Sequence, residues 1–304
     1  MAEALTGQTR VSDIGDLRKL PVEQLITDVQ ARLGTGFDAS TMVRKRRTIG
    51  VRSDRGTWVR IEAQPLDKAA AQGQINNGIE ASALLDGIAK PRWHQAVSWL
   101  DESAGLLWRA DECALITEPS ATPIGYPLTE PELSPDWWRT LNSSLESLAR
   151  QHVTRVATPD TEPITQALVT ETIERAFPDR VDTTISDQRW VPAHADLNWS
   201  NLTAPDCWIL DWEDLGLAPR GLDAATLWVA SLMVPALADK VYRARCADLD
   251  TRSGKIMALF CCSKDLNDPQ FDSAPAFEPT VRHAAELVAD LADPAGPSGD
   301  RRGR

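Results

Sequence analysis

The chain has 304 residues and a net charge of −12, and 42% of its residues are hydrophobic and 25% charged. This composition is typical of a globular protein, and the length predicts about two domains or lobes. Because like charges repel, the excess of acids argues against nucleic acid and anionic membrane surfaces as partners and favours cationic small molecules.

The first half of the chain is predicted to be small and rich in strands. Gly34 and Gly36 follow an amphipathic stretch as helix stop signals, and β-branched and aromatic residues flank a turn that contains Gly56. The expected elements are a helix over residues 22–33, two antiparallel strands around the turn at residues 54–56, a helix over residues 68–85, and a second hairpin whose last strand covers residues 114–117.

The second half is predicted to be mainly helical. It begins at Ser134, an N-cap residue followed by Pro135 at the first helical position. The expected helices cover the stretch after Ser134, residues 164–177, the apolar run 224–238 and residues 280–291, with a mixed segment up to about residue 262 and a loop over residues 265–279. The expected organisation is a nucleotide-binding lobe at residues 1–118, a catalytic and acceptor-binding lobe at residues 119–292, and a disordered tail at residues 293–304.

The expected location of the protein is the cytoplasm. Its five cysteines are an odd set without C-x-x-C spacing, as is usual for reduced thiols, and the first residues lack the apolar core of a signal peptide. The run 224–238 is shorter than the roughly 20 residues that a membrane-spanning helix needs, and it contains Pro235. We therefore interpret it as a buried helix.

Residues 191–214, VPAHADLNWSNLTAPDCWILDWED, carry acidic and amide side chains within otherwise apolar, strand-like sequence. Two short strands are expected at residues 201–203 and 208–210, joined by a turn. Because a hairpin brings its ends together, Asn201 and Asp211 are expected side by side, with Asp196 on the adjoining loop. Such oxygen ligands suit Mg²⁺, which usually binds one or two carboxylates together with substrate phosphates. Asp196 is then left to orient a hydroxyl and accept its proton during phosphoryl transfer.

The spacing of Asp196 and Asn201 matches the catalytic-loop pattern H-R-D-x-x-x-x-N of protein kinases. In more detail, HADLNWSN followed by ILDWEDLGLAPRGLDAATLW resembles the H-G-D-x-x-x-x-N, D-W-E and D-x-A signature of aminoglycoside phosphotransferases and their relatives, including choline and antibiotic kinases. The resemblance is specific over about residues 191–228. It implies an α+β, bilobal protein-kinase-like fold with a small strand-rich N-terminal lobe and a larger helical C-terminal lobe.

The resemblance also implies roles for single residues. Asp196 corresponds to the catalytic aspartate, and Asn201 and Asp211 correspond to the magnesium ligands. His194 corresponds to a residue that orients the loop, and Asp223 to one that anchors the loop from the start of the following helix.

The chain departs from the family pattern at several positions. Ala195 replaces the usual glycine, and Asn198 stands where relatives often carry a second histidine, yet neither change removes a reacting group. The strand WVRIE offers Arg60 where the resemblance implies a phosphate-binding lysine, and an arginine can also clamp phosphate. Glu80, on the following helix, is its expected ion-pair partner, although both can equally be ordinary surface charges. LGTGFDAS is a poor match to a G-x-G-x-x-G loop.

Two classes of function follow from the sequence. The first is a phosphotransferase that moves the γ-phosphoryl group of ATP or GTP to a hydroxyl of a small molecule such as an antibiotic, which would give resistance by inactivation. The second is a non-catalytic binding module that keeps the fold but has a degenerate nucleotide site. The net charge favours a cationic aminoglycoside or peptide antibiotic as acceptor, and a neutral nucleoside or sugar remains an alternative.

Overall fold

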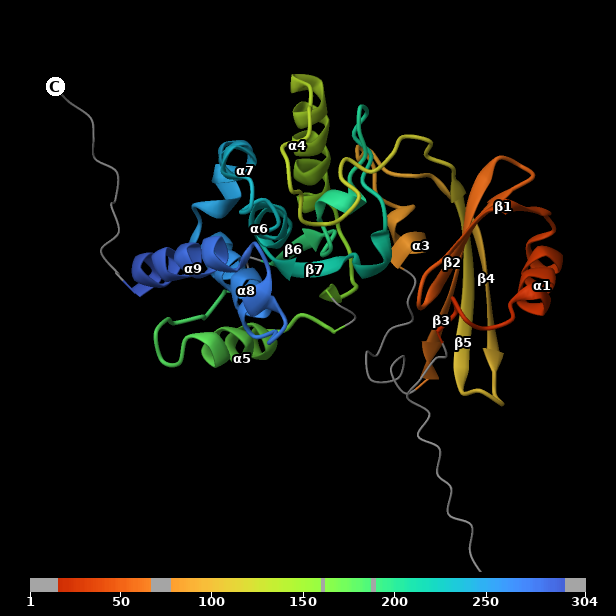
Figure 1. Cartoon of the computed structure of the whole chain (residues 1–304), viewed down its shortest axis with the longest axis horizontal. Coiled ribbons are helices and arrows are strands. Elements are labelled where there is room, and N and C mark those ends of the chain that lie inside the picture. The colour runs from red at the N-terminus through yellow and green to blue at the C-terminus, as the bar shows by residue number, and fades with distance from the viewer. Residues whose placement is uncertain (1–15, 67–77, 160–161, 187–189, 293–304) are drawn as a thin grey trace, which may run out of the picture. The chain divides into compact units, whose positions relative to one another are not determined.

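The computed structural model describes residues 16–66, 78–159, 162–186 and 190–292. The chain divides into two compact units, of which unit 1 comprises residues 1–84 and 91–117, and unit 2 comprises residues 85–90 and 118–304. Unit 1 is built around strands and unit 2 around helices (Figure 1). The predicted α+β class, with a strand-rich N-terminal lobe and a helical C-terminal lobe, is confirmed.

Unit 1 contains a five-stranded antiparallel sheet with the strand order β1-β2-β3-β5-β4. Its described elements are α1 (Glu23–Leu33), β1 (Phe37–Arg44), β2 (Thr48–Ser53), β3 (Thr57–Pro65), α3 (Gly78–Ser82), β4 (Trp93–Asp101) and β5 (Leu106–Ala114). The β2–β3 turn places Gly56 at a φ of 74°, a left-handed conformation that glycine adopts without steric cost.

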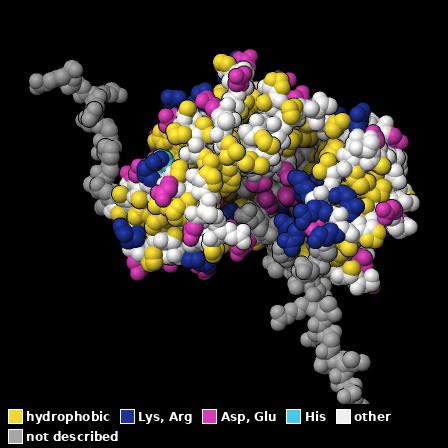
Figure 2. Space-filling model, viewed as in Figure 1, with side chains coloured by type: hydrophobic (Ala, Val, Ile, Leu, Met, Phe, Trp, Pro, Cys, Tyr) yellow, Lys and Arg dark blue, Asp and Glu magenta, His cyan; other side chains and the backbone are white. Residues whose placement is uncertain are grey.

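The sheet has one apolar and one charged face, because side chains alternate along each strand. On the apolar face, Val59 and Ile61 of β3 and Ala110 of β5 are buried against Val29 and Leu33 of α1. The alternate residues of β3 and β5 therefore point to the opposite face, and many of these carry charge. Figure 2 shows a group of Lys and Arg side chains on the strand-rich unit.

The sequence predicted part of this sheet correctly. The helix at residues 22–33 and the hairpin around residues 54–56 are confirmed. The strand β1 was not expected, and the last strand of the second hairpin ends at Ala114 instead of covering residues 114–117. It ends there because its partner β3 begins at Thr57, which lies opposite Ala114. Of the helix expected at residues 68–85, residues 67–77 lie outside the described residues, and α3 is the described part.

Unit 2 is a helical assembly with one small antiparallel sheet. Its helices are α4 (Pro135–Ala149), α5 (Gln166–Ala176), α6 (Leu222–Val229), α7 (Pro235–Leu249), α8 (Arg252–Leu266) and α9 (Phe277–Ala292), and its strands are β6 (Trp190–Ala193) and β7 (Gly216–Pro219). As predicted, Ser134 caps α4, because its side chain accepts a hydrogen bond from the backbone N–H of Trp137. Helix α8 is the central element and packs against α5, α6, α7 and α9.

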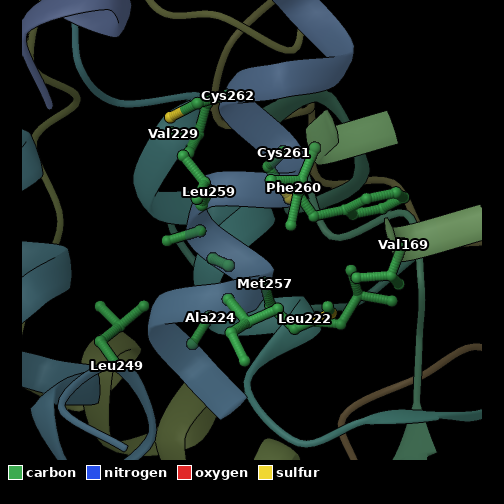
Figure 3. Close-up of a cluster of buried hydrophobic side chains, with 14 of the residues drawn as sticks. Val169, Leu222, Ala224, Val229, Leu249, Met257, Leu259, Phe260, Cys261 and Cys262 are labelled. Atoms are coloured by element: carbon green, nitrogen blue, oxygen red, sulfur yellow. The ribbon is translucent and has the colours of Figure 1, made fainter. Parts of the chain in front are cut away.

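The core of unit 2 gathers around α8. Met257 and Leu259 are completely buried, together with neighbours from α5, α6 and α9. Figure 3 shows these side chains converging on α8 from several elements of the chain. Full burial of one such side chain stabilises the fold by about 1.5–3 kcal/mol, so this cluster anchors the segments that carry the candidate site.

Two expectations for unit 2 are wrong. The apolar run 224–238 is two helices, because α6 ends at Val229 and α7 begins at Pro235, which has no N–H to donate and suits a first helical position. The segment up to residue 262, expected to be mixed, is occupied by α7 and α8. The helices expected at residues 164–177 and 280–291 are confirmed as α5 and α9. The expected tail at residues 293–304 lies outside the described residues.

Within the part of the chain that the structure describes, none of the helices combines the length and the hydrophobicity needed to cross a bilayer.

Candidate active site

The candidate site lies on the long connection between β6 and β7 in unit 2. The two strands pair antiparallel from Ala193 opposite Gly216 outward. Within the connection, the chain folds back on itself, so that the backbone N–H of Leu210 donates to the carbonyl of Asn201 at 2.8 Å. The expected strands at residues 201–203 and 208–210 reduce to a single β-bridge, because residues 199–201 form a 3₁₀ turn. Asn201 therefore lies beside Leu210, the residue before Asp211.

The Asp196 carboxylate is held at both oxygens. The side-chain amide of Asn201 donates to Oδ2 at 2.8 Å, and that of Asn198 donates to Oδ1 at 2.9 Å. Burial raises the pKa of the Asp196 carboxyl above its ordinary value, and the charge of Asp211 raises it further, whereas the two amide hydrogen bonds lower it. A carboxylate with a raised pKa is a better proton acceptor than an exposed one.

His194 connects the loop to the strand that precedes Asp211. Its ring is completely buried, and Nε2 lies 2.7 Å from the carbonyl oxygen of Leu210. Nε2 must carry the proton to donate this bond, which leaves Nδ1 to accept the backbone N–H of Asp196 at 3.3 Å. The ring also meets Trp212 edge-on, with centroids 4.8 Å apart. His194 therefore contacts the backbone of Asp196 and of Leu210, the residue before Asp211.

Asp223 holds the backbone immediately before Asp196. It lies in the first turn of α6, and its two carboxylate oxygens accept the backbone N–H groups of His194 at 2.8 Å and of Ala195 at 2.9 Å. Ala195 has a φ of 70°, in the left-handed region where a Cβ is unfavourable by about 1–2 kcal/mol. Glycine adopts this conformation without steric cost, which agrees with the glycine that the resemblance implies at this position. The two hydrogen bonds that Asp223 accepts offset the strain at Ala195.

The side chains of Asn201 and Asp211 carry oxygen atoms of the kind that bind a hard cation. Asn201 turns its amide nitrogen to Asp196, so its amide oxygen is the end that can face a cation. Among the described residues, no group of three or more His, Cys, Asp or Glu side chains forms a complete metal cage. One carboxylate and one amide, with an acid close by, is instead the partial set that Mg²⁺ uses when phosphate oxygens and water supply the remaining ligands.

A small cavity of about 70 Å³ opens beside Asp196. Its lining includes Leu222 and Thr226 on one face of α6 and the charged residues Lys264 and Asp265 of α8. The Tyr126 hydroxyl donates to Asp265 at 3.1 Å, so a loop before α4 also reaches this place. The cavity is where a small molecule in unit 2 could approach Asp196.

A larger cavity of about 630 Å³ lies elsewhere in unit 2, lined by residues from α6 to α9. It involves Trp228 of α6, about 200° around the helix from Thr226, and Leu232 in the turn after α6, and it does not include Asp196. Its volume alone therefore does not make it the site of the chemistry.

The ion pair predicted between Arg60 and Glu80 is wrong. Glu80 pairs with Arg109 of β5 at 2.9 Å, whereas Arg60 pairs with Glu62 two residues along β3. The register of β3 against β5 explains why these ion pairs differ from the predicted one. Arg60 lies opposite Asp111, and Glu62 lies opposite Arg109. Arg109 also forms an ion pair with Asp111. On the charged face of unit 1, arginines and acids thus alternate as ion pairs, and α3 contacts this face through the pair between Glu80 and Arg109.

These contacts give a prediction for nucleotide binding. We expect Arg60→Ala and Arg109→Ala each to weaken nucleotide affinity about tenfold, because both guanidinium groups lie on the charged face, where a phosphate could exchange for a carboxylate partner. Calorimetric titration with ATP and GTP measures the effect. Arg32→Ala is the matched control, since Arg32 stacks on Trp99 on the opposite face of the sheet. Unchanged affinity in both charged-face variants, or an equal loss in Arg32→Ala, would show that the charged face does not hold phosphate.

Sequence reasoning missed several residues around the site. Arg109 had no motif to mark it, and only the strand register reveals its pairing with Glu80. Tyr126 and Asp265 lie far from the motif in sequence, so only the tertiary fold brings them near Asp196. Asn198 lies inside the motif, and its position two residues after Asp196 was the one sequence feature that indicated a contact between the two side chains.

The two-unit α+β architecture and the Asp196 loop define a protein of the protein-kinase-like fold. Residues 124–254 match a family model, APH, described as the phosphotransferase enzyme family. The resemblance inferred from residues 191–228 is therefore confirmed.

Solved structures share the fold at low sequence identity. Aminoglycoside phosphotransferase APH(4)-Ia matches with a TM-score of 0.53 at 9% identity, covering 88% of this chain and 99% of that one. APH(2″)-IIia, in complex with GDP and kanamycin, matches with a TM-score of 0.52 at 11% identity, covering 88% and 98%. Amicoumacin kinase hAmiN, in complex with AMP-PNP, Ca²⁺ and Ami, matches with a TM-score of 0.50 at 12% identity, covering 90% and 95%. No curated protein sequence gives a significant match.

Proposed function

We propose that this protein is a small-molecule O-phosphotransferase that moves the γ-phosphoryl group of ATP or GTP to a hydroxyl of an antibiotic-like acceptor. The observation that carries the proposal is the Asp196 carboxylate, held by two amides beside Asp211 and open to a cavity. The match of residues 124–254 to the phosphotransferase family model supports the reaction class. The antibiotic and nucleotide complexes of structures with the same fold support the acceptor and donor classes.

In the proposed reaction, Asp196 orients the acceptor hydroxyl and takes its proton. The hydroxyl oxygen bonds to the γ-phosphorus, the bond to the β-phosphate oxygen breaks, and the nucleoside diphosphate leaves. Asn201 and Asp211 would hold Mg²⁺, which when bound neutralises charge on the phosphates. His194 and Asp223 act as positioning residues, because their contacts are to the backbone around Asp196.

A non-catalytic binding module is the second candidate. It is favoured by one observation, the pairing of Arg60 with Glu62, which leaves the β3 cation engaged within its own strand. In that case the loop around Asp196 would be retained for its contribution to folding. The two candidates differ in whether a phosphoryl group is transferred.

A direct experiment separates them. The protein is incubated with Mg²⁺ and either ATP or GTP, together with a panel that contains aminoglycosides, peptide antibiotics, nucleosides and sugars. We expect one member to gain the mass of a single phosphoryl group. The panel tests the cationic acceptors favoured by the net charge of −12 against the neutral alternatives.

The metal provides an independent prediction. Asp211 lies close enough for its charge to raise the pKa of Asp196, so a cation between these acids and the phosphates would relieve repulsion. Calorimetry should therefore show that Mg²⁺ increases nucleotide affinity in the native protein and that Asp211→Asn removes this dependence. The amide keeps the shape and removes the charge. Equal nucleotide affinity in a chelator, or capture of a small ligand without any nucleotide binding, would favour the binding module.

A further inference from the structure

Asn198 has contacts that its place in the sequence did not explain. Its amide nitrogen donates to Oδ1 of Asp196 at 2.9 Å. Its amide oxygen accepts two hydrogen bonds from Ser200, one from the backbone N–H at 3.0 Å and one from the hydroxyl at 2.6 Å. Because both Ser200 groups donate, the oxygen of Asn198 must face them and the nitrogen must face the carboxylate. The side chain of Asn198 is thus held with its N–H group donating to the Asp196 carboxylate.

The neighbouring loop holds Asn198 from the other side. A Cβ at Gly125 would lie 3.1 Å from the amide oxygen of Asn198, closer than most real Cβ contacts. Gly125 also accepts the backbone N–H of Trp199, and the Ser120 hydroxyl donates to the carbonyl of Ser200 at 2.9 Å. The close approach of this loop therefore leaves the Asn198 side chain little room to rotate.

The consequence concerns the carboxylate plane of Asp196. With the Asn201 amide on Oδ2 and the Asn198 amide on Oδ1, both oxygens are fixed, and rotation about the bond that carries the carboxylate breaks both contacts. Each oxygen still has a second lone pair for a hydroxyl. We propose that Asn198, locked by Ser200, is a positioning residue that sets the orientation of the Asp196 carboxylate for the acceptor hydroxyl. This inference rests on the proposed phosphotransfer.

A purely structural role is the competing explanation, because Asn198 also caps the 3₁₀ turn at residues 199–201. Asn198→Ser separates the two roles. Serine is as good a cap as asparagine, but its shorter side chain cannot cap the turn and donate to Asp196 at once. We expect Asn198→Ser to keep the thermal stability and the nucleotide affinity of the native protein while kcat falls about 10- to 100-fold. Ser200→Ala, which removes one of the two anchors, should lower kcat less.

The measurements are kcat and KM with the acceptor found in the panel, nucleotide affinity by calorimetry, and the melting temperature. Side-chain amide spectra by NMR add a readout that needs no acceptor, because the Asn198 amide signal should shift in Asp196→Ala. A native kcat in Asn198→Ser, or a loss of kcat matched by losses of stability and nucleotide affinity, overturns the inference. An absence of turnover in the native protein would instead refute the proposed function, and an Asn198 signal that does not respond to Asp196→Ala would refute the contact itself.

Discussion

Asp196→Ala should lower the rate of phosphoryl transfer about 10²- to 10⁴-fold, the usual contribution of a general base, while nucleotide affinity falls little. Both oxygens of the Asp196 carboxylate accept hydrogen bonds from side-chain amides, and burial raises its pKa. Removing it deletes the proton acceptor and the group that orients the hydroxyl. Single-turnover kinetics with the identified acceptor measure the loss at the chemical step.

Asp206→Ala is the matched control for this prediction. Asp206 lies in the same connection between β6 and β7, but it is exposed and only its backbone carbonyl contacts Thr203. It should keep the native rate and stability. A fully active Asp196→Ala protein, or an equal loss in Asp206→Ala, would show that the connection does not place Asp196 as the base.

The elements of unit 1 were predictable where a local rule dominates. Gly34 ends α1 in the left-handed conformation, and the turn before Gly56 joins β2 and β3 as the alternating pattern indicates. The strand β1 was missed because half of its residues are polar and its pairing depends on its partner β2. The central helix α8 was missed for the opposite reason, since a helix that is buried on most sides has little amphipathic periodicity.

The site was predictable to the extent that it is local in sequence. The hairpin brings Asn201 beside the Asp211 segment, and the spacing of the motif foretold that arrangement. The partner of Glu80 was not predictable, because it depends on the register of β3 against β5. Ion pairs between strands follow from pairing, whereas a motif search compares only positions along one segment. The contact between Asn198 and Ser200 was not predictable either, because it depends on which way the side-chain amide of Asn198 is turned.

Asp223→Ala should destabilise the protein by about 2–4 kcal/mol, because it leaves the buried N–H groups of His194 and Ala195 without their acceptors. Turnover should also fall, because the Ala195 peptide is then free to leave the left-handed region and displace Asp196. Asp239→Ala is the control, an exposed acid on α7 that should change stability by less than about 0.5 kcal/mol. Urea unfolding and kinetics with the same acceptor provide the two measurements.

A second substitution tests whether Asp223 acts through the backbone of Ala195. Ala195→Gly removes the cost of the left-handed conformation and should raise stability by up to about 1 kcal/mol. In the Ala195→Gly protein, the loop needs the hydrogen bonds to Asp223 less to keep its conformation. Asp223→Ala should therefore reduce turnover less than it does with alanine at position 195. The two effects on turnover would then be non-additive, as expected for residues that share one loop. Strictly additive losses would mean that Asp223 affects Asp196 by another route, for example through its charge.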